Sequence, residues 1–85
     1  MFNRVKSVEP LSDMILYVEF VCGEKKYYDV KPLMTKWEVF NDLKANNLFN
    51  LVYVDTGGYG IVWNDYIDLA CDELWHNGKS VQFKN

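Results

Sequence analysis

The chain has 85 residues, a net charge of −3 at pH 7 and a hydrophobic fraction of 49%, which together exclude a disordered polypeptide. Its basic residues are scattered, with Lys25–Lys26 as the only adjacent pair, and phosphate binding depends on clustered Lys and Arg, so nucleic acid is not an expected partner. We expect one domain over residues 1–85, because a chain of this length builds a single core.

Cysteine content and hydropathy indicate the compartment. Two cysteines, Cys22 and Cys71, are too few for the disulfide framework of a small secreted domain, so we expect both to be reduced. The first ten residues contain no apolar signal region, and no run approaches the ~18 apolar residues that span a bilayer. The sequence therefore predicts a cytoplasmic protein that binds no membrane.

The first third of the chain predicts three antiparallel strands. Residues 3–9 form a short edge strand that Pro10 ends, because proline cannot donate to a ladder. Residues 14–21 are rich in β-branched and aromatic residues, and residues 25–30 return after Gly23, which permits the positive φ of a tight turn. Both faces of the second strand are largely apolar, so we expect it to lie centrally with packing on each side, or to be half covered at the edge of a second layer. One face carries Leu16, Val18 and Phe20, and the other carries Ile15, Tyr17, Glu19 and Val21.

Residues Thr35–Ala45 predict the main helix. Thr35 and Glu38 have the spacing of a capping box, in which the side chain of each residue satisfies the backbone amide of the other. Apolar residues recur at helical spacing through this segment, and we interpret them as a stripe that packs on the sheet. The residues of this stripe are Trp37, Phe40 and Leu43.

The second half predicts two more strands and a short helix. Residues 48–55 and 59–63 form the strands, and Asn64-Asp65 is typical of a turn. The short helix carries Asp72 and Glu73 in its first turn and ends at Asn77-Gly78, leaving residues 78–85 as a frayed tail. The order β-β-β-α-β-β-α predicts a two-layer α+β fold, with a mostly antiparallel sheet of four or five strands and the main helix on one face.

Catalytic and metal-binding patterns are weak. His76 is the sole histidine, and its spacing from Cys71 does not bring the two side chains together on one helix. We therefore expect no catalytic residue, no metal-ligand set and no cofactor. One alternative stays open: a small-ligand-binding or metal-assisted enzyme in which Asp55, Asp65 and Asp68 converge, rather than serving turns and a helix start.

Aromatic content favours a different function. Three Trp, six Tyr and five Phe are many for a core of this size, although closing that core is a competing explanation. Because Tyr and Trp anchor protein interfaces, the leading hypothesis is a non-catalytic protein-interaction module. The candidate partner-binding residues are Tyr59, Trp63, Asn64, Asp65, Tyr66 and Asp68.

Three motifs carry a family resemblance over roughly residues 4–76: FVCGEKKYYDVKPLM, WEVFNDLK and VDTGGYGIVWNDYIDLACDEL. In this order they resemble the family of domains of unknown function numbered 2442. Ala70 and Cys71 depart from the pattern, because such sequences often place a capping Ser or Asp there and then Pro; the last helix should start less firmly. The matching positions are Gly23, Asp29, Pro32, Val54, Asp55, Gly58, Trp63, Asp68, Leu69 and Leu74.

The resemblance implies a small bacterial α+β domain with no assigned activity and no agreed catalytic residues. Its members are similar to small proteins encoded beside a companion short protein, sometimes suggested to be toxin–antitoxin pairs. This implies a protein partner encoded by a neighbouring gene and an antitoxin-like or adaptor role. An unpaired edge strand also makes a homodimer an expectation.

Overall fold

The computed structural model describes residues 2–81, in which seven strands form two antiparallel sheets. One sheet has the strand order β1-β2-β3-β7, and the other has the order β4-β5-β6. The strands are β1 (Val5–Pro10), β2 (Ile15–Phe20), β3 (Lys25–Asp29), β4 (Tyr53–Val54), β5 (Gly60–Asn64), β6 (Ile67–Ala70) and β7 (Lys79–Ser80).

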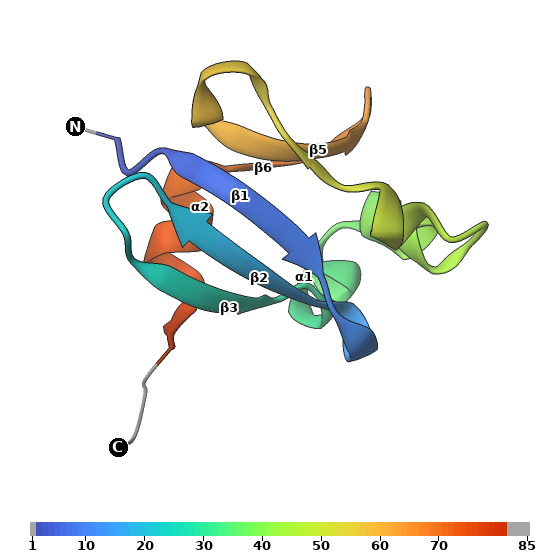
Figure 1. Cartoon of the computed structure of the whole chain (residues 1–85). Helices are drawn as coiled ribbons and strands as arrows, with labels where there is room; N and C mark the ends of the chain where they lie inside the picture. Colours follow the sequence, from blue (N-terminus) through green and yellow to red (C-terminus); the bar gives the residue numbers. More distant parts are fainter. Residues whose placement is uncertain (1, 82–85) are drawn as a thin grey trace.

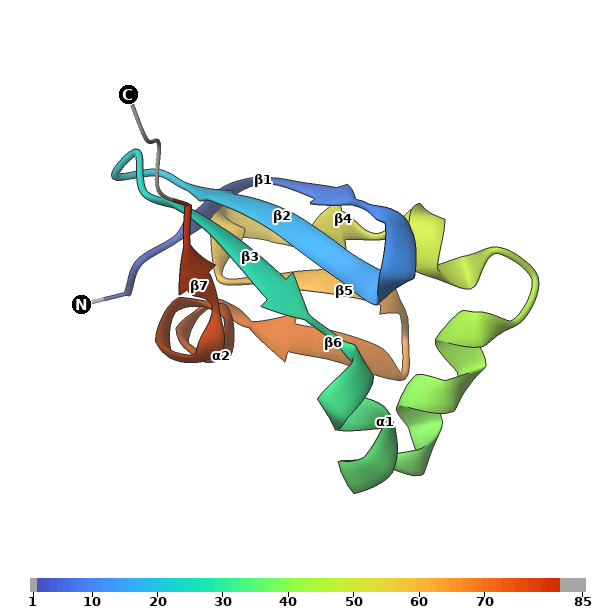
Figure 2. The same cartoon turned by 90° about the horizontal axis from the view of Figure 1, so that it is seen from below.

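Two short α-helices lie at opposite ends of the paired sheets, α2 at one end and α1 at the other (Figure 1, Figure 2). Within residues 2–81 no helix has the length and apolar character needed to cross a bilayer. The helices are α1 (Lys31–Lys36), α2 (Cys71–Asn77) and four 3₁₀ segments, η1 (Ser12–Met14), η2 (Glu38–Lys44), η3 (Leu48–Leu51) and η4 (Thr56–Gly58).

The core lies between the two sheets because the strands alternate buried and outward side chains. Leu16, Val18 and Phe20 on one face of β2 are completely buried, whereas Ile15, Tyr17 and Glu19 on the other face are only partly buried. Leu74 of α2 closes one end of the same cluster. The facing sheet contributes Ile61, Trp63, Ile67 and Leu69. The α+β class and the antiparallel pairing are therefore confirmed.

The prediction of one helix over Thr35–Ala45 is wrong. Helix α1 begins at Lys31, with Pro32 in its first turn, where the missing amide of proline costs nothing. The Thr35 hydroxyl donates to the Pro32 carbonyl oxygen (2.9 Å) instead of capping a helix. Trp37 is extended (φ −131°, ψ 111°) and separates α1 from η2, so the chain bends and Phe40 reaches the core.

Strand boundaries in the second half also differ from the prediction. Residues 48–51 form η3, because Asn47 adopts a left-handed conformation and the turn buries Phe49 against Trp63. Residues 67–70 form β6, a strand for which the sequence made no prediction. The start of the predicted frayed tail is paired, since Lys79–Ser80 lies against β3 as β7, and residues 82–85 fall outside the described part of the chain.

Candidate functional site

A groove lies between α1 and α2. The two helices flank the side of the molecule where β3 and β6 lie (Figure 2). The groove consists of two adjacent cavities of about 570 and 390 Å³. Leu33, Lys36 and Glu73 line both cavities, so they mark the boundary between the two halves. We call the whole depression the α1–α2 groove.

The larger half lies beside β3 and contains a polar bridge. The Tyr28 phenol donates a hydrogen bond to Glu73 Oε2 (2.7 Å), and Asn77 Nδ2 donates to the same oxygen (2.9 Å). Burial, followed by the hydrogen bond to Glu73, raises the pKa of Tyr28 well above its ordinary value. Tyr28 is consequently a neutral hydrogen-bond donor at physiological pH and does not act as a base.

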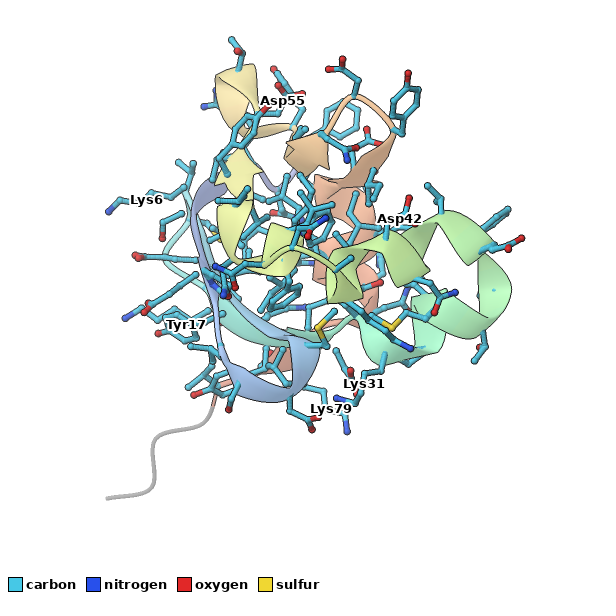
Figure 3. All side chains as sticks on the ribbon, turned by 90° about the vertical axis from the view of Figure 1, so that its right-hand side faces the viewer. Lys6, Tyr17, Lys31, Asp42, Asp55 and Lys79 are labelled. Atoms are coloured by element: carbon cyan, nitrogen blue, oxygen red, sulfur yellow. The ribbon has the colours of Figure 1, made fainter. Side chains whose placement is uncertain are left out.

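Charged residues at the mouth of the larger half are engaged with one another. Lys31 Nζ lies 3.0 Å from Asp29 Oδ1 and 3.2 Å from Asp13 Oδ2. Burial acts to raise the pKa of Asp29, but hydrogen bonds from the Lys31 side chain and backbone outweigh it, so that pKa is lowered. Lys31 and Lys79 lie at the same end of the molecule (Figure 3), and Lys79 contributes to this lowering.

The smaller half has an apolar floor between exposed aromatic walls. Phe40 and Leu69 are buried and line its base. Trp37, which is 59% exposed, lines it from the junction of α1 and η2, and Tyr66, which is 83% exposed, lines it from the β5–β6 turn. Aromatic side chains beside an apolar floor are typical of protein-binding surfaces.

The predicted partner-binding residues lie in different parts of the structure, and Trp63 lies in the core. Trp63 is only 4% exposed, and its Nε1 donates to the Phe49 carbonyl oxygen (3.1 Å). Asn64 has a local role, because its Oδ1 accepts the backbone amides of Tyr66 (2.8 Å) and Ile67 (3.0 Å) and so shapes the turn before β6. Neither side chain lines the α1–α2 groove.

The other predicted residues are exposed but do not form one patch. Tyr66 and Asp68 both line the smaller half of the groove, and Asp65 lies in the turn beside them. Tyr59 precedes β5, at the end of that strand away from this turn, and packs edge-to-face on Phe2 with ring centroids 5.6 Å apart. Tyr59 therefore belongs to a separate surface.

The three carboxylates of the alternative enzyme hypothesis do not converge. Asp55 lies opposite Gly60 at the start of β5, while Asp65 follows Asn64 at its end, so roughly 13 Å of strand separates the two positions. Asp55 Oδ1 instead accepts the Thr56 amide (2.8 Å), at the end of the molecule remote from Lys31 and Lys79 (Figure 3). Among residues 2–81, no three Asp, Glu, His or Cys side chains form a metal-binding group.

Both cysteines are free thiols, with Cys22 exposed and Cys71 buried. Burial, together with the neighbouring Asp72 carboxylate, raises the pKa of the Cys71 thiol. Ala70 provides no side-chain hydrogen bond to cap α2, as the departure from the family motif suggests. Cys71 is therefore a packing residue at the first position of an uncapped helix.

Comparison with known proteins identifies the family of this chain. No curated protein and no solved structure matches this chain. The family resemblance expected from the three sequence motifs is confirmed, because residues 5–80, most of the chain, match a family model. The chain belongs to the family described as "Protein of unknown function (DUF2442)".

Proposed function

We propose that this chain is a non-catalytic protein-interaction module whose α1–α2 groove binds a segment of a small partner protein encoded by a neighbouring gene. The observation that carries the proposal is the exposure of Trp37 and Tyr66, which line the same cavity beside the buried Phe40 and Leu69. Large aromatic side chains bury much apolar surface on association and lose little side-chain entropy, so they supply much of an interface's binding energy.

The polar chemistry of the groove also favours binding over catalysis. The buried phenol of Tyr28 is neutral and donates its hydrogen bond to Glu73, and Asn77 donates to the same carboxylate. Asp29 is paired with Lys31 at the groove mouth. These contacts join β3 to α2 and to the start of α1, which suits a preformed binding surface.

Within this proposal the module has an antitoxin-like or adaptor role in the cytoplasm, with the neighbouring gene product as its partner. The two free thiols, Cys22 and Cys71, are compatible with a reducing compartment. The homodimer expected from the sequence stays a prediction, to be measured by light scattering alongside the partner experiments.

Co-expression tests the proposal directly. The tagged chain is produced together with the product of the adjacent gene, and the complex is isolated and its affinity measured by calorimetry. Trp37→Ala and Tyr66→Ala should each weaken binding by about 2 kcal/mol, the usual cost of truncating an anchor residue. Tyr53→Ala is the matched control, because Tyr53 is an exposed tyrosine that does not line the groove.

Two outcomes contradict the proposal. One is that the neighbouring protein and the chain, both folded, do not associate. The other is that Tyr53→Ala or Tyr59→Ala weakens the complex as much as Trp37→Ala does, which would place the interface outside the groove. A preserved far-ultraviolet spectrum for each variant separates lost binding from lost folding.

A further inference from the structure

Strand β6 has an open edge, and the hydrogen bonds of its sheet show which backbone groups point along that edge. The Asp55 amide donates to Gly60 O (2.9 Å), so Gly60 faces β4, and the Cys71 amide donates to Tyr59 O (2.8 Å), so Tyr59 faces β6. Backbone groups alternate in direction along an antiparallel ladder, so Ile61 also faces β6, where it opposes Leu69.

The same alternation applied to β6 directs Leu69 toward β5 and Asp68 and Ala70 away from it. The amide and carbonyl of Asp68, and the amide of Ala70, therefore point out from the sheet. Within residues 2–81 none of these three groups has a hydrogen-bond partner. Asp68 and Leu69 line the smaller half of the α1–α2 groove, so the open edge lies along the groove.

We propose that the partner's segment binds in extended conformation and adds a strand to the open edge of β6, with a basic side chain beside Asp68. This inference rests on the proposed function and specifies the backbone conformation and the charge of the segment that the groove binds. Strand addition uses the Asp68 amide and carbonyl as its main-chain contacts, and alternate side chains of the segment enter a neighbouring pocket. Here that pocket is the apolar floor of Phe40 and Leu69 between Trp37 and Tyr66.

Charge around β6 selects a basic segment. Asp68 is exposed in the strand, Asp65 is exposed in the turn before it, and Glu73 lines the groove beside it. Lys36 is the sole cationic residue lining the smaller half. A lysine or arginine opposite Asp68 gains a cross-strand ion pair, whereas an acidic residue there is repelled.

The same charges disfavour a second copy of this chain as the occupant. Antiparallel pairing of two β6 strands about Asp68 would place the two Asp68 carboxylates opposite each other, with the two Asp65 side chains nearby. Like charges directly opposite on paired strands are destabilising. A heterologous segment that carries positive charge avoids this repulsion.

The probe is a short fluorescein-labelled peptide in which lysine alternates with leucine, compared with a peptide in which glutamate alternates with leucine. We expect fluorescence anisotropy to show binding of the lysine peptide at least roughly tenfold tighter than binding of the glutamate peptide, weakening as salt is raised. Amide hydrogen exchange followed by NMR should show new protection at Asp68 and Ala70 when the lysine peptide binds. A helical peptide in the groove would leave those two amides unprotected.

Variants at Asp68 separate charge from backbone pairing. Asp68→Asn keeps the amide and should weaken the lysine peptide about threefold, the range of an exposed ion pair. Asp68→Pro removes the outward amide but no hydrogen bond to β5, so it should abolish binding. Asp68→Lys should reverse the preference between the two peptides, and Glu9→Lys, an equal charge change at an exposed position of β1, should not.

The strand-addition inference is overturned if both peptides bind equally, if neither binds, or if Asp68 and Ala70 stay unprotected in the complex. Its failure is distinguishable from failure of the proposed function. A neighbouring gene product that binds with sensitivity to Trp37→Ala, yet leaves the Asp68 amide exchanging freely, keeps the groove as the site and rejects strand addition. Cooperative urea unfolding of Asp68→Pro confirms that this variant is folded.

Discussion

The Tyr28 phenol and the Glu73 carboxylate are joined by a 2.7 Å hydrogen bond that connects strand β3 to helix α2 in the larger half of the groove. The residues are 45 positions apart in the chain, so the contact closes a long loop and holds α2 against the edge of the four-stranded sheet. Asn77, one turn further along α2, donates to the same Glu73 oxygen and limits its movement. The bridge thus couples groove shape to the stability of the domain.

Replacing Tyr28 with phenylalanine should destabilise the domain by about 1 kcal/mol, because the ring stays packed but the hydrogen bond to a carboxylate is lost. Urea denaturation measures the change as a lower midpoint with an unchanged slope. Tyr53→Phe is the control, since Tyr53 is exposed and its hydroxyl has no partner among residues 2–81. Equal stabilities of Tyr28→Phe and the parent would show that the bridge contributes nothing.

Alkaline pH should destabilise the folded chain through Tyr28. Its pKa is raised in the fold from the ordinary 10.0, so its contribution is fully present below pH 10.0 and is lost as pH rises toward the folded value. The free energy of unfolding should therefore fall above pH 10.0 more steeply for the parent than for Tyr28→Phe. Denaturant titrations over a pH series check this, and parallel curves for the two proteins would contradict it.

Acidic pH should also destabilise the folded chain, through Asp29, and here stability falls as the pH falls. Hydrogen bonds from Lys31 lower the folded pKa of Asp29 below its ordinary 3.8, so its contribution is present above pH 3.8 and is lost as pH falls through the folded value. Asp29→Asn should be slightly less stable than the parent at neutral pH, and this gap in the free energy of unfolding should disappear at acidic pH. High salt should also shrink the gap at neutral pH, because the pair is solvent-exposed. A gap that persists unchanged below pH 3.8 would exclude this ion pair as its cause.

Two glycines with positive φ provide a test of close packing between the sheets. A Cβ on Gly58 (φ +79°) would lie 2.5 Å from the Val5 carbonyl oxygen of β1, whereas a Cβ on Gly23 (φ +98°) would meet nothing within 4 Å. Gly23→Ala should cost about 1 kcal/mol from backbone strain alone, and Gly58→Ala should cost about 3 kcal/mol or more, because β1 must also move. Thermal unfolding ranks the two variants, and the reverse order would contradict the packing of η4 on β1.

Local sequence signals located strand β2 and the end of β5, but not the inward face of β2. Alternation grouped Leu16, Val18 and Phe20 on one face, which the structure buries, although both faces of the strand are largely apolar in sequence. The Asn64-Asp65 turn signal lies where β5 ends. The second sheet was not predictable in this way. Strand β6 is short, alternates as Ile67, Asp68, Leu69 and Ala70, and leads directly into α2, so its periodicity covers too few residues to distinguish a strand from a helix start.

The groove was even harder to predict from sequence, because it depends on a single interruption of the helical segment. Helical spacing placed Trp37 in line with Phe40 and Leu43, but a proline in the first turn at Pro32 starts the helix four residues early, and the extended Trp37 ends it. That break rotates Trp37 outward while Phe40 and Leu43 remain buried. Lys31-Pro32 was the available signal, since proline favours the first turn of a helix.

Stability measurements distinguish the outward position of Trp37 from the core position that helical spacing predicted. Trp37→Ala should cost less than about 1 kcal/mol, because the side chain is 59% exposed and its removal leaves no closed cavity. Phe40→Ala should cost about 3 kcal/mol, since Phe40 is 6% exposed and packs edge-to-face on Trp63 with ring centroids 6.3 Å apart. Guanidinium unfolding of both variants provides the comparison. A loss for Trp37→Ala as large as that for Phe40→Ala would return Trp37 to the core and remove one wall of the α1–α2 groove.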